Sequence, residues 1–296
     1  MMLYFNLLRI SHWVKNLFLF LPLFFSGKIM DDMSALWHVS IGFILFSFTA
    51  SSIYIINDLK DVEADRLHPE KKNRPFASGR ISANSGIAIA ILLLVIAFVG
   101  AYLLNIYFMF VLSAYFFMNI AYSLGLKHVA IIDITIIATG FLFRVLAGGL
   151  VANVHISHWI MLMTFLLALF LGLAKRRDDV IIFLESGQRM RKSVDGYNLE
   201  FINASMVIMS AVVIVSYIMY TISDDTVIRF NTRYLYVTGI FVIIGIIRYL
   251  QITFVYNKSG NPTKVLLNDR FLQLTLICWI ITFFLIIYIN HLYRAG

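Results

Sequence analysis

The sequence predicts an all-α membrane protein, a single domain of about nine transmembrane helices. The first observation is composition: 60% of the 296 residues are hydrophobic and only 14% are charged, whereas a soluble domain carries about a quarter charged residues. The second observation is that the hydrophobic residues gather into long runs. The third is that no low-complexity segment interrupts them, and that the chain has only four prolines. Lipid is therefore the expected solvent for most of the surface.

Eight runs reach or approach the roughly 20 apolar residues that a helix needs to cross the hydrocarbon core. They cover residues 35–56, 86–104, 106–124, 129–151, 156–174, 201–222, 234–250 and 271–289. A ninth run, near 17–26, is shorter and follows a polar entry that contains Arg9, Lys15 and Asn16. It is not a signal peptide, because the sequence at 24–27 offers no cleavage site of small residues. We expect it to form a tilted first helix.

The distribution of positive charges predicts the orientation of the chain in the membrane. An odd number of spans puts the two termini on opposite sides of the membrane. If the N-terminus is cytoplasmic, the outside segments hold only Lys28, Arg229, Arg233 and Arg294. The positive-inside rule then predicts a cytoplasmic N-terminus for a protein of the cell (inner) membrane. The two long polar loops, near 57–84 and 175–200, would open to the cytoplasm, where we expect the active site.

The formal net charge of +8 does not indicate nucleic acid, because most basic residues lie in short loops between apolar runs. That pattern is typical of membrane topology and of anionic ligands at a membrane face. The single cysteine, Cys278, excludes an internal disulfide and a cysteine metal cluster.

The first polar loop opens with an amide and three acids at helical spacing: Asn57, Asp58, Asp61 and Asp65. Continued as a helix, this spacing puts all four side chains on one face, where the carboxylates repel one another and require a cation. Oxygen ligands without histidine or thiol suit Mg²⁺, which takes one or two carboxylates and completes its shell with waters and phosphates. We therefore predict a magnesium–diphosphate site. The alternative is a solvated acidic helix end.

Basic residues follow these acids along the same loop, among them Arg66, Lys71 and Arg74. A bound diphosphate requires carboxylates that hold its metal ion and, beside them, basic side chains that bind its phosphate oxygens. This neighbourhood favours the metal site over the solvated helix end.

Asp133 and Arg144 lie inside the predicted span at 129–151. Ionisable residues at this depth almost always face a cavity. Eleven residues separate them, which is close to three turns and about 16 Å of rise, so they face the same way but cannot pair directly. We expect Asp133 at the reaction centre and Arg144 bracing the cavity wall. Structural hydrogen bonds between helices are the alternative for both.

The acidic motif resembles the first aspartate-rich motif of the UbiA superfamily of intramembrane prenyltransferases. The resemblance implies a nine-helix bundle around a central cavity. It also implies an isoprenyl diphosphate held through Mg²⁺ at two such motifs, and transfer of the prenyl group to an acceptor. The second loop departs from that pattern, because it reads Lys175-Arg176-Arg177-Asp178-Asp179, with one adjacent pair of acids and a dense basic cluster. This composition favours a site that binds more phosphate oxygens. The alternative is that these basic residues only follow the positive-inside rule of membrane topology.

Further segments resemble one UbiA branch, the decaprenyl-phosphate phosphoribosyltransferases, from about residue 9 to 201. They are Arg9-x-x-x-Trp13-Val14-Lys15-Asn16, His68-Pro69, Arg74-Pro75-x-Ala77-x-Gly79 and Tyr122-Ser123-x-x-Leu126-Lys127-His128, together with Asp133, Arg144, Gly148, Lys175, Arg176 and Tyr197. The sequence departs from that branch at Ile10, where a proline is usual, and at Asp179, where a glutamate is expected.

This resemblance implies transfer of 5-phosphoribose from phosphoribosyl pyrophosphate to a polyprenyl phosphate in cell-envelope biosynthesis, with Mg²⁺ as cofactor and the bilayer as surroundings. The oligomeric state stays open, including a homo-oligomer. The implied catalytic residues are Asp58, Asp61 and Asp133, and the implied metal ligands are Asn57, Asp58, Asp61 and Asp65. The implied substrate-binding residues are Lys15, Arg66, Lys71, Arg74, Tyr122, Lys127, Arg144, Lys175, Arg176, Arg177 and Asp179. Lys127 lies near Tyr122 at the end of a span. The alternative for Lys127 is that it only follows the positive-inside rule.

Two rival functions remain open at this point. An ordinary UbiA prenyltransferase, with a prenyl diphosphate donor and an aromatic or other small acceptor, shares the fold and the first metal site. A transporter or channel for an anionic solute would show broken helices at corresponding positions. Only Gly140 and the pair Gly148-Gly149 suggest such a break, and no matching pair occurs in another span.

Overall fold

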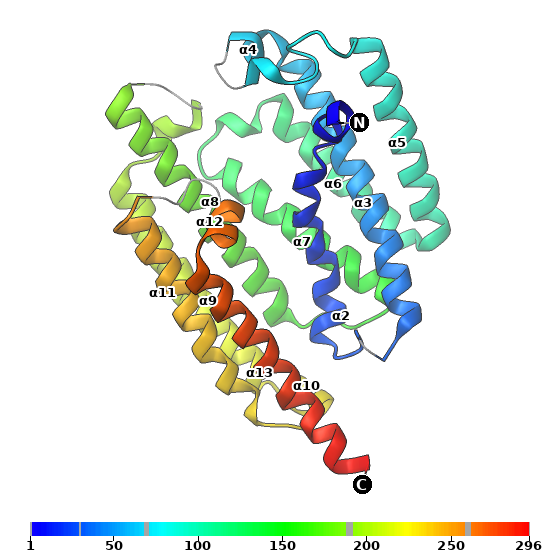
Figure 1. Cartoon of the computed structure of the whole chain (residues 1–296), viewed down its shortest axis with the longest axis vertical. Coiled ribbons are helices and arrows are strands. Elements are labelled where there is room, and N and C mark those ends of the chain that lie inside the picture. Colours follow the sequence, from blue (N-terminus) through cyan, green and yellow to red (C-terminus); the bar gives the residue numbers. More distant parts are fainter. Residues whose placement is uncertain (1, 30, 68–70, 188–191, 258–261, 296) are drawn as a thin grey trace. The chain divides into compact units, whose positions relative to one another are not determined.

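The computed structural model describes residues 2–29, 31–67, 71–187, 192–257 and 262–295, and within these ranges the chain forms helices and no strand. Eight helical segments of the described part are long and apolar enough to cross a membrane. They are α3 (Met33–Lys60), α5 (Ala83–Leu104), α6 (Ile106–Leu124), α7 (Ile132–Ala152), α8 (His158–Ser186), α9 (Leu199–Ile222), η5 (Tyr234–Thr238) continued by α11 (Gly239–Phe254), and α13 (Arg270–Ala295). The predicted all-α membrane fold is confirmed (Figure 1).

The N-terminal segment differs from the expected ninth span. It consists of α1 (Met2–Leu8), the 3-10 helix η1 (Ile10–Phe20) and α2 (Leu21–Phe25). Its apolar part, Ile10–Phe25, is shorter than the other eight. The 3-10 form partly compensates for this, because it rises about 2.0 Å per residue against about 1.5 Å in an α-helix. The expected number of nine spans is therefore approximate.

Short helices fill the connections. They are α4 (Val62–Leu67), η2 (Lys71–Asn73), η3 (Leu126–His128), η4 (Lys192–Gly196), α10 (Asp224–Phe230) and α12 (Pro262–Asn268).

Polar residues begin most of the long helices, as the capping preferences of Ser, Asn and Asp require. The capping side chains that accept a backbone N–H are Asp32 for α3, Ser82 for α5, Asn105 for α6, Ser157 for α8 and Asn198 for α9. Asn105 is also the only residue between α5 and α6, and its backbone N–H closes α5 on the carbonyl of Ala101.

Residue contacts group the chain into two compact units. The first unit comprises Met1–Gly125 and Phe143–His155, and the second comprises Leu126–Leu142 and Ile156–Gly296. In the first unit α3 packs against α5, α6 and η1, around a core that includes Phe46, Phe108 and Leu112. In the second unit α8 packs along α9, and α11 packs against α9 and α13. The expected single transferase domain stays a prediction.

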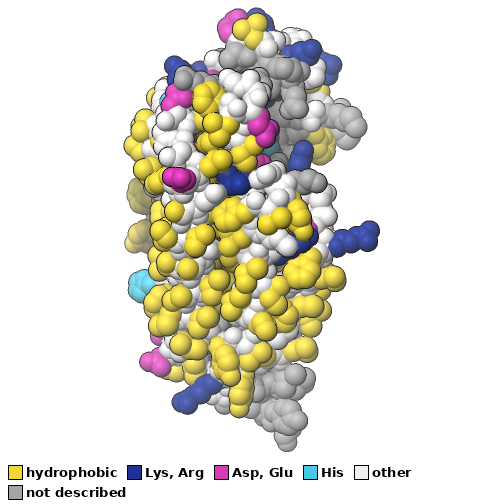
Figure 2. Space-filling model, turned by 90° about the vertical axis from the view of Figure 1, so that its left-hand side faces the viewer, with side chains coloured by type: hydrophobic (Ala, Val, Ile, Leu, Met, Phe, Trp, Pro, Cys, Tyr) yellow, Lys and Arg dark blue, Asp and Glu magenta, His cyan; other side chains and the backbone are white. Residues whose placement is uncertain are grey.

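The surface outside these cores is strongly apolar. Hydrophobic side chains are spread over much of the face drawn in Figure 2, most densely below its upper end. On α5, for example, Ile91, Val95 and Val99 are all more than half exposed. Such a surface agrees with lipid as the surrounding solvent.

The polar loops are shorter than the sequence indicates. The helix α8 continues to Ser186, so residues 175–186 are helical and only the remainder of the expected 175–200 loop connects α8 to α9. The hydropathy pattern ends at the charged residues, but lysine, arginine and glutamate are good helix formers. The loop near 57–84 likewise starts late, because α3 runs to Lys60 and α4 follows almost at once.

Candidate functional site

The acidic motif straddles the end of α3. The helix stops at Lys60, Asp61 has φ −92° and ψ 8°, and α4 begins at Val62. Two backbone hydrogen bonds nevertheless keep the helical register, from Asp61 N to Asn57 O at 3.0 Å and from Asp65 N to Asp61 O at 2.8 Å. Local helical spacing therefore survives across the break.

The four motif side chains form two pairs. The Asn57 amide donates to the Asp61 carboxylate at 3.2 Å. Asp58 and Asp65 are both buried, and Arg74 bridges them, with its Nη1 3.0 Å from Asp58 Oδ1 and 2.6 Å from Asp65 Oδ2. Two buried carboxylates thus share one guanidinium, which is the compensation that a buried charge requires.

A second arginine binds the same acid. Arg9 Nη2 lies 2.5 Å from Asp58 Oδ1, and its guanidinium stacks over the Tyr54 ring at 4.8 Å. Arg9 has φ 48°, in the left-handed region that non-glycine residues rarely adopt. The contacts with Asp58 and Tyr54 hold this strained residue in place.

The donor set fits a magnesium–diphosphate complex better than a fully protein-ligated ion. Among the described residues, no group of three or more His, Cys, Asp and Glu side chains is arranged to hold a metal. The motif offers only oxygen ligands, and Mg²⁺ needs one or two carboxylates when waters and phosphates complete its shell. The ligand roles of Asn57, Asp58, Asp61 and Asp65 remain predictions.

Arg66 and Lys71 are two further bases of this loop. Arg66 is exposed and pairs with Glu63 at 3.3 Å, and Lys71 is partly exposed in η2. Arg74 is the base of this loop that bridges Asp58 and Asp65. His68 and Pro69, which belong to the family resemblance, lie outside the described residues.

Arg144, on α7, contacts three other helices of the first unit, η1, α6 and α3. Its Nε donates to Asn16 Oδ1 on η1 at 2.8 Å, and its Nη2 donates to the Tyr115 hydroxyl on α6 at 3.0 Å. The guanidinium also lies over the rings of Phe46 and Tyr115, at 5.1 and 5.0 Å. The Asn16 amide in turn donates to Ser47 on α3 at 2.8 Å.

A glycine allows η1 to approach α7 this closely. A Cβ added to Gly148 would lie 1.9 Å from the carbonyl oxygen of Leu19. Gly148 stands one helical turn after Arg144, so the backbone contact and the Arg144–Asn16 hydrogen bond occupy the same face of α7.

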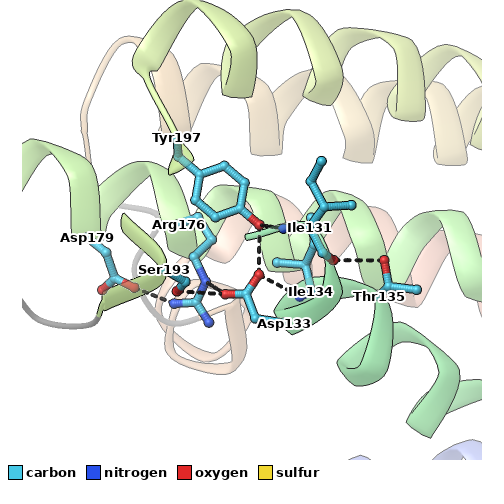
Figure 3. A network of polar contacts seen from close by, with 8 residues as sticks. All are labelled: Ile131, Asp133, Ile134, Thr135, Arg176, Asp179, Ser193 and Tyr197. Atoms are coloured by element: carbon cyan, nitrogen blue, oxygen red, sulfur yellow. Dashed lines mark hydrogen bonds and ion pairs between the residues drawn. The ribbon is translucent and has the colours of Figure 1, made fainter. Parts of the chain in front are cut away.

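Asp133 is the centre of a network in the second unit, drawn in Figure 3. Its side chain is 0% exposed, and it forms an ion pair with Arg176, which is 1% exposed, at 2.7 Å. Asp133 Oδ2 also accepts from the Ser193 hydroxyl at 3.0 Å, and Oδ1 accepts from the Tyr197 hydroxyl at 2.7 Å. Arg176 continues the network to Asp179.

Tyr197 links this network to the backbone that precedes α7. Its hydroxyl accepts from the backbone N–H of Ile131 at 2.6 Å, and Ile131 has φ 68°. Burial raises the pKa of the Tyr197 phenol, and the hydrogen bond to Asp133 raises it further. Tyr197 therefore stays neutral and donates its proton to the carboxylate.

The basic cluster on α8 divides among different partners. Arg177 donates to the carbonyl of Thr253 at 2.7 Å and to Asn257 Oδ1 at 2.8 Å, near the C-terminus of α11. Arg176 belongs to the Asp133 network, whereas Lys175 is exposed. The contact with Thr253 satisfies one of the backbone carbonyls that a helix end leaves without partners. The substrate roles of the three cations stay predictions.

Tyr122 and Lys127 are both partly exposed. Tyr122 lies near the end of α6 in the first unit, and Lys127 lies in η3 in the second unit. Their substrate-binding roles stay predictions.

Sequence reasoning missed two members of the Asp133 network and one partner of Asp58. Ser193 carries no signal in the sequence, because an isolated serine in a polar connection is common. Tyr197 and Arg9 occur in the segments that resemble the phosphoribosyltransferase branch, but only the structure joins them to acids.

The comparisons with known proteins agree with this architecture. A model of the UbiA prenyltransferase family matches residues 18–180. The decaprenyl-phosphate phosphoribosyltransferase of Mycolicibacterium smegmatis is 33% identical over 291 residues, covering 95% of this chain and 91% of that protein. The protein of that name from Corynebacterium glutamicum is 28% identical over 289 residues, covering 97% of this chain and 87% of its own length.

Among solved structures, a UbiA homologue from Archaeoglobus fulgidus bound to GPP and Mg²⁺ matches this fold with a TM-score of 0.71 at 20% identity. The match covers 96% of this chain and 99% of that one.

Proposed function

The chain belongs to the UbiA prenyltransferase family and is a membrane transferase of that family, and from this premise we propose that it transfers 5-phosphoribose from phosphoribosyl pyrophosphate to a polyprenyl phosphate. The observation that carries this proposal is the similarity, over nearly the whole length, to relatives named decaprenyl-phosphate phosphoribosyltransferase. The departures of the second loop from the ordinary prenyltransferase pattern support the same choice.

The donor's diphosphate binds at the acidic motif in this proposal. Asn57 and Asp61, with one of the buried acids Asp58 and Asp65, would hold the magnesium ion, whose chemistry is to neutralise charge on the departing pyrophosphate. Arg74 and Arg9 neutralise Asp58 in its absence. On donor binding these guanidiniums would turn to phosphate oxygens.

The reaction is a displacement at the anomeric carbon of ribose. An oxygen of the lipid phosphate forms the new bond to C1 while the bond from C1 to the pyrophosphate oxygen breaks, and pyrophosphate leaves with the electron pair. No proton transfer is needed, because the attacking phosphate oxygen is already ionised. The protein contributes orientation and charge stabilisation through the passage of an oxocarbenium-like state.

We assign Asp133 a positioning role in this reaction. Both of its carboxylate oxygens accept hydrogen bonds within the protein, one from Tyr197 and Ile134 N and the other from Arg176 and Ser193. Through these contacts Asp133 would hold Arg176 and the segment at 192–197, and its direct catalytic role stays a prediction.

The proposed setting is the cell (inner) membrane, with the N-terminus and the active site on the cytoplasmic side. Its support is the excess of basic residues in one set of connections. Phosphoribosyl pyrophosphate is water-soluble and would reach the site from the cytoplasm, whereas the lipid phosphate would arrive within the bilayer.

The test uses the full chain, purified in detergent, with labelled phosphoribosyl pyrophosphate, Mg²⁺ and a polyprenyl phosphate. We expect label to enter the lipid fraction in wild-type protein. Asp61→Asn should lower the rate about a hundredfold, the typical effect of losing one electrostatic contact to a transition state. Asp31→Asn, the same change at an exposed acid between α2 and α3, should keep the wild-type rate.

Equal rates for the Asp61→Asn and Asp31→Asn proteins would refute the metal-site assignment. Replacing the donor by a labelled prenyl diphosphate, with an aromatic acceptor, tests the ordinary prenyltransferase activity. Label transfer only in that second assay would overturn the phosphoribosyl proposal.

A further inference from the structure

The backbone of Ile131, directly before α7, is strained. Its φ of 68° lies in the left-handed region, where the branched side chain of isoleucine collides with the backbone. Among the described residues, the other non-glycine positions of positive φ are Arg9 and three asparagines, Asn153, Asn231 and Asn257. Asparagine tolerates this region, whereas a β-branched residue there is an outlier. The strain at Ile131 therefore requires a cause in its surroundings.

Neither packing nor helix capping accounts for an isoleucine at this position. The residue is 56% exposed, so burial of its side chain does not offset the strain. It precedes Ile132, the first residue of α7, at a place where Ser, Thr, Asp and Asn are preferred and isoleucine is among the poorest residues. Strained residues of this kind persist only where their neighbours hold them, and they cluster at functional sites.

Hydrogen bonds hold the backbone of Ile131 on both sides (Figure 3). Its carbonyl accepts from the backbone N–H and from the hydroxyl of Thr135, at 2.9 and 2.8 Å. Its N–H donates to the Tyr197 hydroxyl at 2.6 Å. Thr135 belongs to the first turn of α7 itself, whereas Tyr197 follows η4. The Tyr197–Ile131 contact thus ties two connections that are distant in the sequence.

The same two connections touch at the preceding pair of residues. A Cβ added to Gly196 would lie 2.4 Å from the Cβ of Ala130, an atom that cannot swing aside as the end of a long side chain can. Ser193 and Tyr197 also both donate to Asp133. The segments at 126–131 and 192–197, both within the second unit, are therefore held together as one body.

The stretch before Ile131 carries basic side chains. The 3-10 helix η3 contains Lys127 and His128, and the N–H of Val129 closes this turn on the carbonyl of Leu126 at 3.2 Å. A change of φ at Ile131 would rotate the whole preceding stretch relative to α7, because the backbone bends only at its φ and ψ torsions. The conformation of Ile131 consequently sets the direction in which η3 presents its basic side chains.

We propose that Tyr197 is a positioning residue for donor binding. Its hydroxyl holds Ile131 in the strained conformation, and Ile131 in turn fixes η3 in the orientation that binds the diphosphate of the donor. Tyr197 does not touch the donor in this role, since it acts through the backbone N–H of Ile131. The identity of the donor rests on the proposed function. A purely structural Tyr197 would affect stability and leave donor affinity unchanged.

The first test measures donor affinity without turnover. The full chain in detergent is titrated with phosphoribosyl pyrophosphate and Mg²⁺ by calorimetry, with no lipid acceptor present. Tyr197→Phe keeps the ring and should weaken binding about tenfold, roughly the value of one hydrogen bond. Gly196→Ala leaves the hydrogen-bonding groups intact but pushes η4 away from Ala130, and it should weaken binding as well. Tyr236→Phe, at a side chain that is 53% exposed, should keep wild-type affinity.

A rescue experiment separates positioning from general damage. Because glycine adopts positive φ without steric cost, Tyr197→Phe should weaken donor binding only about threefold or less when it is combined with Ile131→Gly. Val129→Gly is the matched control, since Val129 does not have a positive φ. Combined with that change, Tyr197→Phe should keep its full effect. Equal effects of Tyr197→Phe in the wild-type, Ile131→Gly and Val129→Gly backgrounds would overturn the proposal.

Hydrogen exchange reports the contact itself, independently of the donor. The amide hydrogen of Ile131 should exchange faster in Tyr197→Phe than in wild type or Tyr236→Phe, because it loses its acceptor. Faster exchange with wild-type donor affinity would refute the positioning role. Binding of geranyl diphosphate that depends on Tyr197, in a protein that does not bind phosphoribosyl pyrophosphate, would support the positioning role and refute the proposed function.

Discussion

Asp133 and Arg176 form an ion pair that solvent does not reach, with side-chain exposures of 0% and 1%. Removing charges from water is expensive, and the attraction between them offsets this cost only when the remaining lone pairs and protons also find partners. Ser193, Tyr197 and Asp179 supply those partners. The arrangement explains why residues far apart in the sequence must be kept together.

Breaking this ion pair from one side should be more damaging than neutralising both sides. Arg176→Leu leaves buried carboxylate charge uncompensated and should lower the free energy of unfolding by about 3–5 kcal/mol. Adding Asp133→Asn should recover part of that loss, which would appear as a coupling energy in a double-mutant cycle. The measurement is unfolding of the detergent-purified protein followed by circular dichroism. Additive losses would contradict the paired arrangement.

Tyr197 offers a milder test of the same network. Tyr197→Phe removes the donor to Asp133 and the acceptor for the Ile131 N–H, and should cost about 1–3 kcal/mol because buried polar groups lose their partners. Tyr236→Phe makes the same chemical change at a side chain that is 53% exposed, so its thermal midpoint should match wild type. Equal midpoints for the two variants would show that the Tyr197 hydroxyl contributes nothing to stability.

At the level of elements, the close contact of η1 with α7 is possible because residue 148 is a glycine, which has no Cβ. The buried residues of η1, Asn16 and Leu19, lie against the face of α7 that carries Arg144. Because Asn16 bonds both Arg144 and Ser47, a shift of η1 would disturb α3 and α7 together.

Gly148→Ala should therefore separate η1 from α7. The new methyl would lie 1.9 Å from the Leu19 oxygen, and overpacking of this kind typically costs about 1–3 kcal/mol. Gly125→Ala is the matched control, since nothing lies within 4 Å of its added Cβ. Thermal unfolding in detergent would report both; a Gly148→Ala protein as stable as the Gly125→Ala protein would contradict the close packing.

The sequence predicted the spans well because a helix in lipid must show a long apolar run. It did not predict that α8 continues past Lys175, because hydropathy reports where the apolar run stops and not where the helix stops. The spacing of Asp133 and Arg144 correctly implied separate partners. It did not identify Arg176 or Asn16, because those contacts depend on packing between helices distant in the sequence.

At the scale of the whole molecule, the magnesium ion proposed for the acidic motif takes part in the reaction and is not required for folding. In the structure, Asp58 and Asp65 are already neutralised by Arg74, and Asp58 also by Arg9. A protein whose buried acids have resident counter-charges does not need an ion to fold. This distinguishes the site from structural metal centres, which contribute folding energy directly.

Chelation should consequently abolish activity without unfolding the protein. With EDTA, transfer of labelled ribose to lipid should fall to background and return when Mg²⁺ is added in excess. The thermal midpoint of the donor-free protein should change by less than about 2 °C, since no folding contact is lost. A large fall in the midpoint on chelation would mean that the ion, and not Arg74, holds the two acids together.

The single-residue link at Asn105 has a consequence for biosynthesis. The Asn105 side-chain oxygen accepts hydrogen bonds from the backbone N–H groups of Tyr107 and Phe108 in the first turn of α6, directly after α5 ends. Because one residue joins α5 to α6, the two helices cannot insert into the bilayer separately. We therefore expect them to leave the translocon together as a preformed hairpin. A tag spliced between them would then be tolerated far less well than one in any longer connection.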